Sequence, residues 1–526
     1  MLAPSLTAAD DRPYPRRWAA LIVLSVALLM IVAANTSLTV AVTDVQQKLG
    51  ATTSQTRWIL DAYALAVASL LLLFGGVGDR YGRRLTLNVG LIGFAAAAAW
   101  GALSTTATEL IAARTLLGVA GALIMPATLA YVRVLFPPQE RKAAFAIWSG
   151  SSGAALALGP LGAGALVSPL GWQAVFWVDV PLAVGLLILG AFTVPASRNE
   201  SAPRIDVVGA VLSTAVLAPL MYGIIEGHDK GWLSSMVLGA FGIALVALAA
   251  FVAWERHTPS PMLDLTWFRA PAFRMGAGLS VLGFTVVVGV LYVAVLFLQQ
   301  HELHGAFRTG AELLPLGVGV LAGAAVNGPA VRRFGLRLPV VVGLVLLAGG
   351  CTVVGLDQSG YLPLAVALAL VGLGAGAFLP TLTEAVMNGA PDEAGGVAGA
   401  TADAAVELGA ALGIAVLGSV LTTGYDDRLP GTIANLPAAA HSAVHDSLYG
   451  AHVVAGHLPA DQAHALTQAA NHAFLHGLSL AGIVGAGIAV VSAALAIRMP
   501  RHASATQEQD AERRAAGALR PASETA

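Results

Sequence analysis

Two acidic residues, Asp403 and Glu407, lie four positions apart in a stretch of small and apolar residues near 400–422. In a helix this spacing places both carboxylates on one face, one turn apart. Two carboxylates in a medium of low dielectric constant repel each other, so one of them is expected to hold a proton near neutral pH. Such a pair can take up and release a proton, and its ionised form attracts an organic cation. The alternative for Asp403 is a polar residue that marks the start of the helix.

Two more charged residues lie inside apolar segments. Asp61 comes one turn into the segment 58–77, and Arg114 comes one turn into the segment 110–132. An arginine within a membrane costs about 2.5–3.5 kcal/mol, so Arg114 is expected to face a cavity and a partner. Both residues start from the same side, so they could meet as a coupling pair. The alternatives are that Asp61 is interfacial and that Arg114 extends to the outer surface.

The composition indicates that membrane-spanning helices position these residues. Of 526 residues, 57% are apolar and 11% charged, whereas a soluble protein carries about 25% charged residues. Net charge is −2, which gives no indication of nucleic-acid binding. About 20 apolar residues cross the hydrocarbon core. Fourteen such segments are predicted, near 18–42, 58–77, 86–104, 110–132, 143–167, 172–194, 207–225, 233–254, 276–298, 311–330, 339–356, 362–388, 400–422 and 477–498.

The distribution of basic residues predicts the orientation. Of the 28 lysines and arginines, 22 fall in the two termini and in the loops on the same side as the termini, and five fall in the opposite loops. Cytoplasmic loops carry the excess of Lys and Arg, so both termini are expected to be cytoplasmic. Residues 499–526 are predicted to form a disordered tail.

The long segment 423–476 is predicted to lie outside the membrane, between the last two spans. The spacing of Leu448, His452 and Ala455, and of alanine, leucine and phenylalanine over 463–474, suggests one or two surface helices. Seven of the twelve histidines lie here, and His441 and His445 have helical spacing. Without a fixed set of three ligands we expect a solvated segment and no metal.

A glycine-rich charged motif, Gly76-x-Gly78-Asp79-Arg80-x-Gly82-Arg83-Arg84, lies between two apolar segments and is expected to form a tight turn at the membrane surface. A degraded copy spans 328–337, with Arg332 in the place of Asp79. The first copy resembles the loop 2–3 signature of the major facilitator superfamily. This resemblance implies a conformational latch at Gly76, Asp79, Arg80, Gly82 and Arg83, in which Asp79 lies at a helix N-terminus and pairs with Arg80 or Arg83.

Further motifs extend the resemblance over roughly residues 18–498. Arg114-x-x-x-Gly118-x-x-Gly121 is similar to a segment of the fourth helix, and Gly159, Pro160 and Gly164 resemble the "antiporter" motif of drug exporters. With its fourteen predicted spans, the chain is similar to the fourteen-helix drug:proton antiporter family and to QacA-type multidrug exporters. Gln173 and Asp179 differ from the residues that this family usually has at the start of its sixth helix. Asn35 lies where such exporters often carry a titratable acid.

The resemblance implies an all-α polytopic fold, with two six-helix bundles and two inserted helices. The expected parts are a cytoplasmic N-terminus (1–17), an N-terminal bundle (18–194), an inserted pair (207–254), a C-terminal bundle with the long outer segment (276–498) and the tail. The functional expectation is a proton-coupled antiporter, not an enzyme and without a cofactor, that exports amphipathic and cationic drugs across the cytoplasmic membrane. Its partners would be protons, substrate and lipids, and the chain is expected to be a monomer.

Proton coupling is assigned to Glu407, Asp403, Asp61 and Arg114, since Asn35 cannot titrate. The substrate is expected to contact Glu407, Asp403, Asn35 and a set of aromatic liners: Tyr63, Trp148, Phe284 and Tyr292. Two alternatives stay open. One is a dedicated exporter of a single neutral or anionic metabolite or antibiotic, which the missing acid at Asn35 favours over a polyspecific pump. The other is a membrane sensor or scaffold that does not transport.

Overall fold

The computed structural model describes residues 14–51, 53–197, 206–259, 261–391, 394–429 and 438–500, and every element of regular secondary structure in them is a helix. Fourteen segments among them are long and apolar enough to cross a membrane. The all-α fold and the predicted number of spans are therefore confirmed for the described part of the chain. The chain is a multi-pass membrane protein. Residues 1–13 and 501–526, and with them most of both predicted terminal segments, lie outside the described residues.

The helices follow one another along the chain with short connections. Their bounds are α1 (Arg17–Leu49), α2 (Thr53–Tyr81), α3 (Arg83–Leu103), α4 (Ala107–Leu135), α5 (Pro138–Leu170), α6 (Gln173–Thr193), α7 (Val207–Lys230), α8 (Ser235–His257), η1 (Leu265–Arg269), α9 (Pro271–Leu296), η2 (Phe297–His301), α10 (Ala306–Glu312), α11 (Leu314–Phe334), α12 (Arg337–Leu356), α13 (Tyr361–Asn388), α14 (Gly395–Asp426), α15 (Ala438–Asp446), α16 (Leu448–Ala455) and α17 (Ala460–Ala496).

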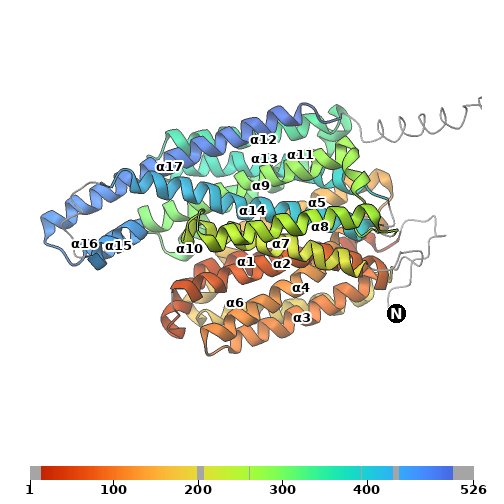
Figure 1. The fold of residues 1–526 in the computed structure, drawn as a ribbon, viewed down its shortest axis with the longest axis horizontal. Coiled ribbons are helices and arrows are strands. Elements are labelled where there is room, and N and C mark those ends of the chain that lie inside the picture. Colours follow the sequence, from red (N-terminus) through yellow and green to blue (C-terminus); the bar gives the residue numbers. More distant parts are fainter. Residues whose placement is uncertain are drawn as a thin grey trace, which may run out of the picture.

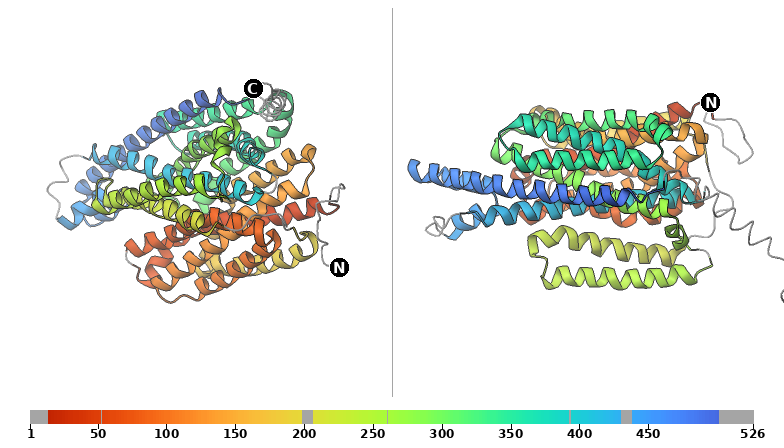
Figure 2. Two further views of the ribbon diagram at one scale, coloured as in Figure 1. Left: turned by 45° about the vertical axis from the view of Figure 1, so that its right-hand side comes forward. Right: turned by 90° about the horizontal axis from the view of Figure 1, so that it is seen from above.

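Two groups of six spans form the body of the molecule (Figure 1). Helices α1–α6 enclose one apolar core, and the spans from α9 to α17 enclose a second. The groups meet where α2 and α4 pack on α14 and where α5 packs on α10 and α11. Helices α7 and α8 pack on each other along one side of the body, as Figure 2 shows, and α7 packs on α2 and α14. This is the predicted architecture of two bundles and an inserted pair.

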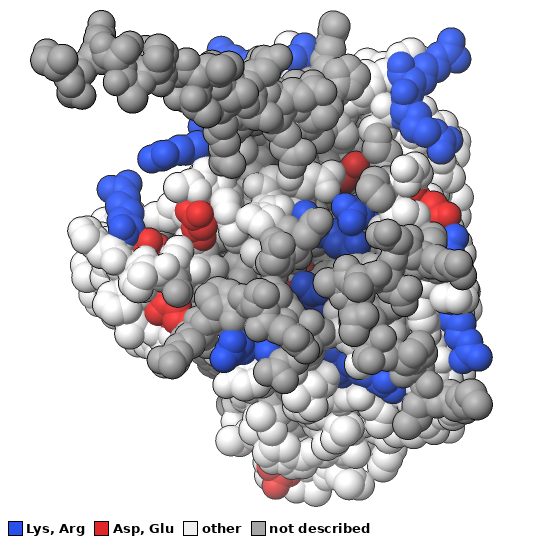
Figure 3. Space-filling view, turned by 90° about the vertical axis from the view of Figure 1, so that its right-hand side faces the viewer, with Lys and Arg blue, Asp and Glu red and all other residues white. Residues whose placement is uncertain are grey.

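The start of α1 and the end of α17 lie at the same end of the molecule (Figure 1). Described arginines are concentrated at this end, which we call the basic face (Figure 3); the other end is the opposite face. The basic face carries Arg16, Arg17, Arg80, Arg83, Arg84, Arg133, Arg141, Arg256, Arg269, Arg274, Arg332, Arg333, Arg337 and Arg498.

The charged motif 76–84 is more helical than the sequence analysis expected. α2 continues through Tyr81, α3 begins at Arg83, and Gly82 alone lies between them with a φ of 111°. Only glycine takes this conformation without steric cost. The expected tight turn is therefore reduced to one residue, because the helix keeps its backbone hydrogen bonds up to the membrane surface.

The segment 423–476 is also more helical than expected. α14 ends at Asp426, and α17 already starts at Ala460. Leu448, Ala451 and Ala455 form the buried side of α16, a surface helix as predicted. The second expected surface helix, over 463–474, is the first part of α17. Helices α14 and α17 thus extend beyond the other spans at the opposite face, with α15 and α16 near their tips (Figure 1).

Candidate functional site

Both candidate acids lie on the face of α14 that packs against α2. Near the start of α14, a Cβ on Gly75 of α2 would lie 2.6 Å from the carbonyl oxygen of Gly396 and 2.7 Å from the Cβ of Ala400. Asp403 and Glu407 continue this stripe, since positions 396, 400, 403 and 407 share one helical face. At about 1.5 Å per residue they lie about 12 Å and about 18 Å into α14. The acids are therefore placed between the two bundles, near the middle of the spans.

The two carboxylates have different surroundings. Asp403 is 3% exposed, and its Oδ2 has no hydrogen-bond partner in the part of the chain that the structure describes. Glu407 is partly exposed, and its charge acts on Asp403 and on the phenol of Tyr63 in the other bundle. A buried carboxylate oxygen without a donor is costly unless a proton or a cation neutralises it. A proton or a cation at this position would satisfy the Asp403 oxygen.

Small residues on a neighbouring face bring α14 against α9. A Cβ on Gly409 would lie 2.9 Å from the Cβ of Phe284, and Gly413 approaches the backbone of α9 in the same way. Phe284, a predicted liner, is 7% exposed and lies at this contact. Tyr292, another predicted liner, lies further along α9, where a Cβ on Gly418 would be 3.1 Å from its ring. Both aromatic rings thus line the packed contact between α9 and α14.

Arg114 is fully buried in the N-terminal bundle. Its guanidinium donates hydrogen bonds to Ile59 O (3.0 Å), Ala34 O (3.2 Å), Asn35 Oδ1 (3.1 Å) and Leu60 O (3.3 Å). Asp61 is not among the hydrogen-bond partners of Arg114 in the described part of the chain. Arg114 therefore joins α4 to α1 and α2 through backbone carbonyls and Asn35 rather than through a direct bond with Asp61.

Tyr63 lies beside Arg114 and within electrostatic reach of Glu407. Its ring centroid lies 4.6 Å from the Arg114 Cζ, an attractive cation–π arrangement. Its hydroxyl donates to the carbonyl of Ile31 at 3.0 Å. Asp179 of α6, 6% exposed, lies within electrostatic reach of both Arg114 and Tyr63. In the sequence, Asp179 stands out only as a departure from a motif. Its position as a charge in an apolar helix could have identified it.

Trp148, the remaining predicted liner, belongs to the interior of the N-terminal bundle. It is 4% exposed, and its Nε1 donates to Thr128 Oγ1 at 3.1 Å. This bond ties α5 to α4. Of the predicted liners, Tyr63 and Trp148 are therefore held by hydrogen bonds, and Phe284 lies at the α9–α14 contact.

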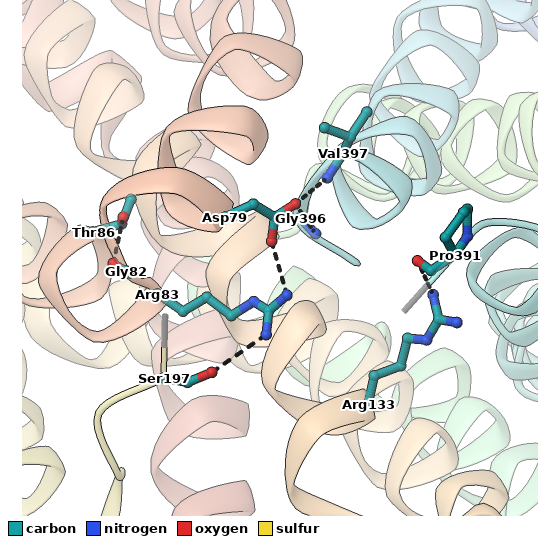
Figure 4. Close-up of polar contacts among 9 residues, drawn as sticks. All are labelled: Asp79, Gly82, Arg83, Thr86, Arg133, Ser197, Pro391, Gly396 and Val397. Carbon is teal, nitrogen blue, oxygen red and sulfur yellow. Dashed lines mark hydrogen bonds and ion pairs between the residues drawn. The ribbon is translucent and has the colours of Figure 1, made fainter. Parts of the chain in front are cut away.

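The charged motif connects the two bundles at the basic face (Figure 4). Asp79 Oδ1 accepts from Arg83 Nη2 at 2.8 Å, and Asp79 Oδ2 accepts from the backbone N–H of Gly396 at 2.7 Å and of Val397 at 3.3 Å. Arg83 also donates to Ser197 Oγ at 3.4 Å. The N-terminus of a helix carries partial positive charge and free N–H groups. Asp79 therefore caps α14 from across the bundle interface.

Arg133 of α4 also connects the two bundles at the basic face, through the segment between α13 and α14. It donates from Nη2 to the carbonyl of Ala390 at 3.0 Å and from Nη1 to that of Pro391 at 3.4 Å. An anion thus contacts the N–H groups that begin α14, and a cation contacts carbonyls that follow α13 (Figure 4). We call Asp79, Arg83 and Arg133, with the backbone groups they bind, the clamp.

At the opposite face the bundles meet through close packing. The Cα of Phe307 in α10 would lie 2.7 Å from a Cβ on Gly164 in α5, and Gly310 lies equally close to the backbone of Pro160 and Leu161. Gly159 packs on Ala33 and Thr36 of α1. α5 continues as a helix through Pro160. The antiporter motif thus provides the contact surface for α1 on one side and α10 on the other.

The histidines beyond the opposite face make local contacts. The rings of His441 and His445 lie 4.6 Å apart, and His445 Nδ1 is 3.1 Å from Asp426 Oδ1. Within the described residues, no group of three or more His, Cys, Asp and Glu side chains is arranged to hold a metal ion.

Comparisons with known proteins identify the family. The model of the Major Facilitator Superfamily matches residues 23–414. The chain is 34% identical to the tetracenomycin C resistance and export protein of Streptomyces glaucescens, over 92% of this chain and 91% of that protein. It is 33% identical to the multidrug efflux pump LfrA of Mycolicibacterium smegmatis, over 93% and 97%. It is 32% identical to the methyl viologen resistance protein SmvA of Salmonella typhimurium, over 89% and 94%.

Solved structures agree on the fold. The human organic anion transporter MFSD10 superimposes with a TM-score of 0.64 at 17% identity, over 92% of this chain and all of that one. The proton:xylose symporter XylE gives 0.59 at 14% identity, over 92% and 96%. At these identities the likeness shows the fold alone. From its two bundles, its motifs and its sequence relatives, we conclude that the chain belongs to the Major Facilitator Superfamily.

Proposed function

We propose that this protein exports amphipathic, cationic organic compounds in exchange for protons, across a cytoplasmic membrane in which the basic face is cytoplasmic. Relatives named for drug efflux and antibiotic resistance, similar over most of their length, support export of a drug-like substrate. The arginines gathered on the basic face support the orientation. The chain itself supplies the groups that such an exchange needs.

The observation that carries the proposal is the position of Asp403 and Glu407. They lie one turn apart on the α14 face that meets the other bundle, and one carboxylate oxygen of Asp403 is buried without a partner. When the pair is ionised, its charge attracts a cation, and burial of the apolar body of the cation adds free energy. When a proton binds, that attraction is lost and the cation leaves. Competition of proton and cation for one pair couples their movements in opposite directions.

The N-terminal bundle supplies a fixed charge to this site. Arg114 stays positive, and both it and Glu407 act electrostatically on Tyr63. Asp179 and Asp61 both lie in the field of Arg114. We assign these two acids to proton transfer or charge balance within the first bundle, and we assign Arg114 to holding that network in place. The clamp would close the basic face while the site opens to the opposite face.

A second function within the same class is a dedicated exporter of one antibiotic. Asn35 favours it, because it is bonded to Arg114 and cannot carry the negative charge that a second binding site for cations would offer. Relatives named for single antibiotics, tetracenomycin C and puromycin, agree with this alternative.

The test is transport in proteoliposomes with an imposed pH gradient and ethidium as cargo. Wild-type protein should accumulate ethidium only with the gradient, and Glu407→Gln should abolish gradient-driven accumulation while the protein still folds. Glu226→Gln is the matched control, since Glu226 lies on α7 and pairs with Lys230 at 2.9 Å. Gradient-driven transport by Glu407→Gln at the wild-type rate would reject the role of the pair. A wild type that carries an anionic antibiotic but not ethidium would favour the dedicated exporter.

A further inference from the structure

A second group of carboxylates lies at the basic face, in the inserted helices and outside the transport site. Asp206 caps α7: its Oδ1 accepts from the backbone N–H of Gly209 at 2.8 Å. The indole Nε1 of Trp254 donates to Oδ1 at 2.9 Å and to Oδ2 at 2.8 Å. Glu255 follows Trp254 in the last turn of α8, and Asp264 caps η1. Two N–H donors, the backbone of Gly209 and the indole of Trp254, thus contact the Asp206 carboxylate.

Glu255 is only partly satisfied. It is 5% exposed, its Oε2 accepts from the backbone N–H of Leu263 at 3.3 Å, and the N–H of Met262 also acts on the carboxylate, whereas its Oε1 is buried without a partner in the described residues. This orphaned oxygen faces Asp206 across a glycine. A Cβ on Gly209 would lie 2.7 Å from Glu255 Oε1 and 2.5 Å from Asp206 Oδ2. Both oxygens therefore border the space that the missing side chain at Gly209 leaves empty.

Among the residues that the structure describes, the charges that act on Glu255 are negative. Asp206 faces it from α7 and Asp264 from η1, and the first turn of α14 carries no charged residue. Arg256 and His257, its neighbours on α8, are exposed. Two ionised carboxylates this close repel, whereas one proton turns Glu255 Oε1 into a donor toward Asp206 Oδ2. A shared proton thus satisfies the orphaned oxygen and removes the repulsion.

The same cluster touches the clamp. Leu263, whose N–H binds Glu255, packs with Phe251 of α8 and Val397 of α14 in a small apolar core. Val397 is one of the two residues whose N–H groups bind Asp79. The position of the connection between α8 and η1 is therefore linked by direct contacts to the closed basic face.

We propose that Glu255 is a proton-binding site in the inserted helices, distinct from the transport site, which shares its proton with Asp206 and so holds Leu263 against the start of α14. Protonation stabilises the closed basic face. Loss of the proton drives the two carboxylates apart, withdraws Leu263 from Val397 and weakens the clamp. The inserted pair thereby makes closure of the basic face depend on the pH on that side.

The test measures closure directly, without transport. Spin labels at Leu85→Cys and Leu338→Cys, two exposed positions on the first turns of α3 and α12, report the separation of the bundles at the basic face. The native Cys351 is replaced by alanine. In wild-type protein the ratio of closed to open molecules should fall severalfold as pH rises from about 6 to about 9. Glu255→Gln, which keeps the shape of the protonated acid, should stay closed and lose this dependence on pH.

The controls separate this site from the others. Glu226→Gln in the same inserted pair should keep the wild-type pH dependence. Asp206→Asn, which removes the facing anion, should also stay closed at high pH and provides a second variant if Glu255→Gln fails to fold. A Glu255→Gln protein that opens with pH as the wild type does would overturn the proposal. Ethidium transport by Glu407→Gln tests the proposed function independently of this result.

Discussion

The two copies of the charged motif share a backbone and differ in chemistry. Gly82 and Gly335 both join consecutive helices at the basic face, with φ of 111° and 79°. In the first copy Asp79 is 6% exposed and binds Arg83 and the start of α14. In the second copy Arg332 takes that place and is exposed. Both copies of the motif therefore have the glycine turn, but only the first copy, at 76–84, contributes to the clamp.

The two helices that carry the motifs pack on different helices, α14 and α5. The first turns of α14 and α5 explain why only the first motif forms the clamp. α2 packs on α14, and α11 packs on α5 in the corresponding way. α14 has no acidic residue in its first turn, so Asp79 supplies the negative charge from outside. α5 has its own, Glu140, which binds Arg17 Nε at 2.7 Å. Under the proposed function, closure of the basic face is therefore expected to depend on the α2–α14 contact.

The largest effect is expected for Asp79→Asn. The change removes the charge that Arg83 and the start of α14 share, and hydrogen bonds to charged groups contribute about 1.5–3 kcal/mol each. The ratio of closed to open molecules, measured with the labels at positions 85 and 338, should fall by about tenfold or more. A closed population equal to that of the wild type would contradict the role of Asp79.

A smaller shift is expected for Arg133→Ala. The carbonyls of Ala390 and Pro391 lose their donors, but they lie near the basic face, where water can replace part of the lost bonds. Opening should increase severalfold by the same measurement. Arg133→Lys keeps the charge and should recover part of the closed population. If alanine and lysine have equal effects, the charge on Arg133 does not stabilise closure.

Gly82→Ala and Gly335→Ala separate the turn from the clamp. Each forces an L-residue into a positive φ, at a cost of about 1–2 kcal/mol. Both variants should therefore lower the temperature of thermal unfolding, followed by tryptophan fluorescence, by a similar amount. Only Gly82→Ala should also open the basic face, because Asp79 and Arg83 flank Gly82. Equal opening in both variants would show that the two turns have the same role.

The smallest effect is expected for Arg332→Ala. An exposed arginine away from a buried network changes stability by no more than about 0.5 kcal/mol. The distance distribution between the labels should match that of the wild type. An opening as large as that of Asp79→Asn would assign a clamp to the second motif as well.

The sequence predicts the spans because each one must be long and apolar to cross the membrane. It is less informative about helix ends, since α17 begins in polar residues at Ala460, well before the apolar run near 477. There the helix continues because Leu466, Ala470 and Phe474 pack on neighbouring elements. Those partners have no signature in the local sequence.

The functional residues also differ in how far the sequence predicts them. Asp403 and Glu407 are recognisable because their spacing alone places them on one face. The partner of Asp79 is a pair of backbone N–H groups more than three hundred residues later, and the partners of Arg114 are mostly backbone carbonyls. Backbone groups occur at every position, so a sequence pattern cannot select them. The approach of Glu255 to Asp206 depends on Gly209, because a side chain there would fill the space beside both carboxylates. This effect arises only once α7 and α8 are packed together.

The clamp and the acid pair both involve α14, and we propose that the acids of this helix exchange a proton for cargo. The most direct measurement is proton release from purified protein in weakly buffered detergent when ethidium is added. The wild type should release protons in proportion to the ethidium bound, and the release should be lost in the double variant Asp403→Asn/Glu407→Gln and kept in Asp79→Asn. Ethidium binding by the wild type without any proton release would contradict the account.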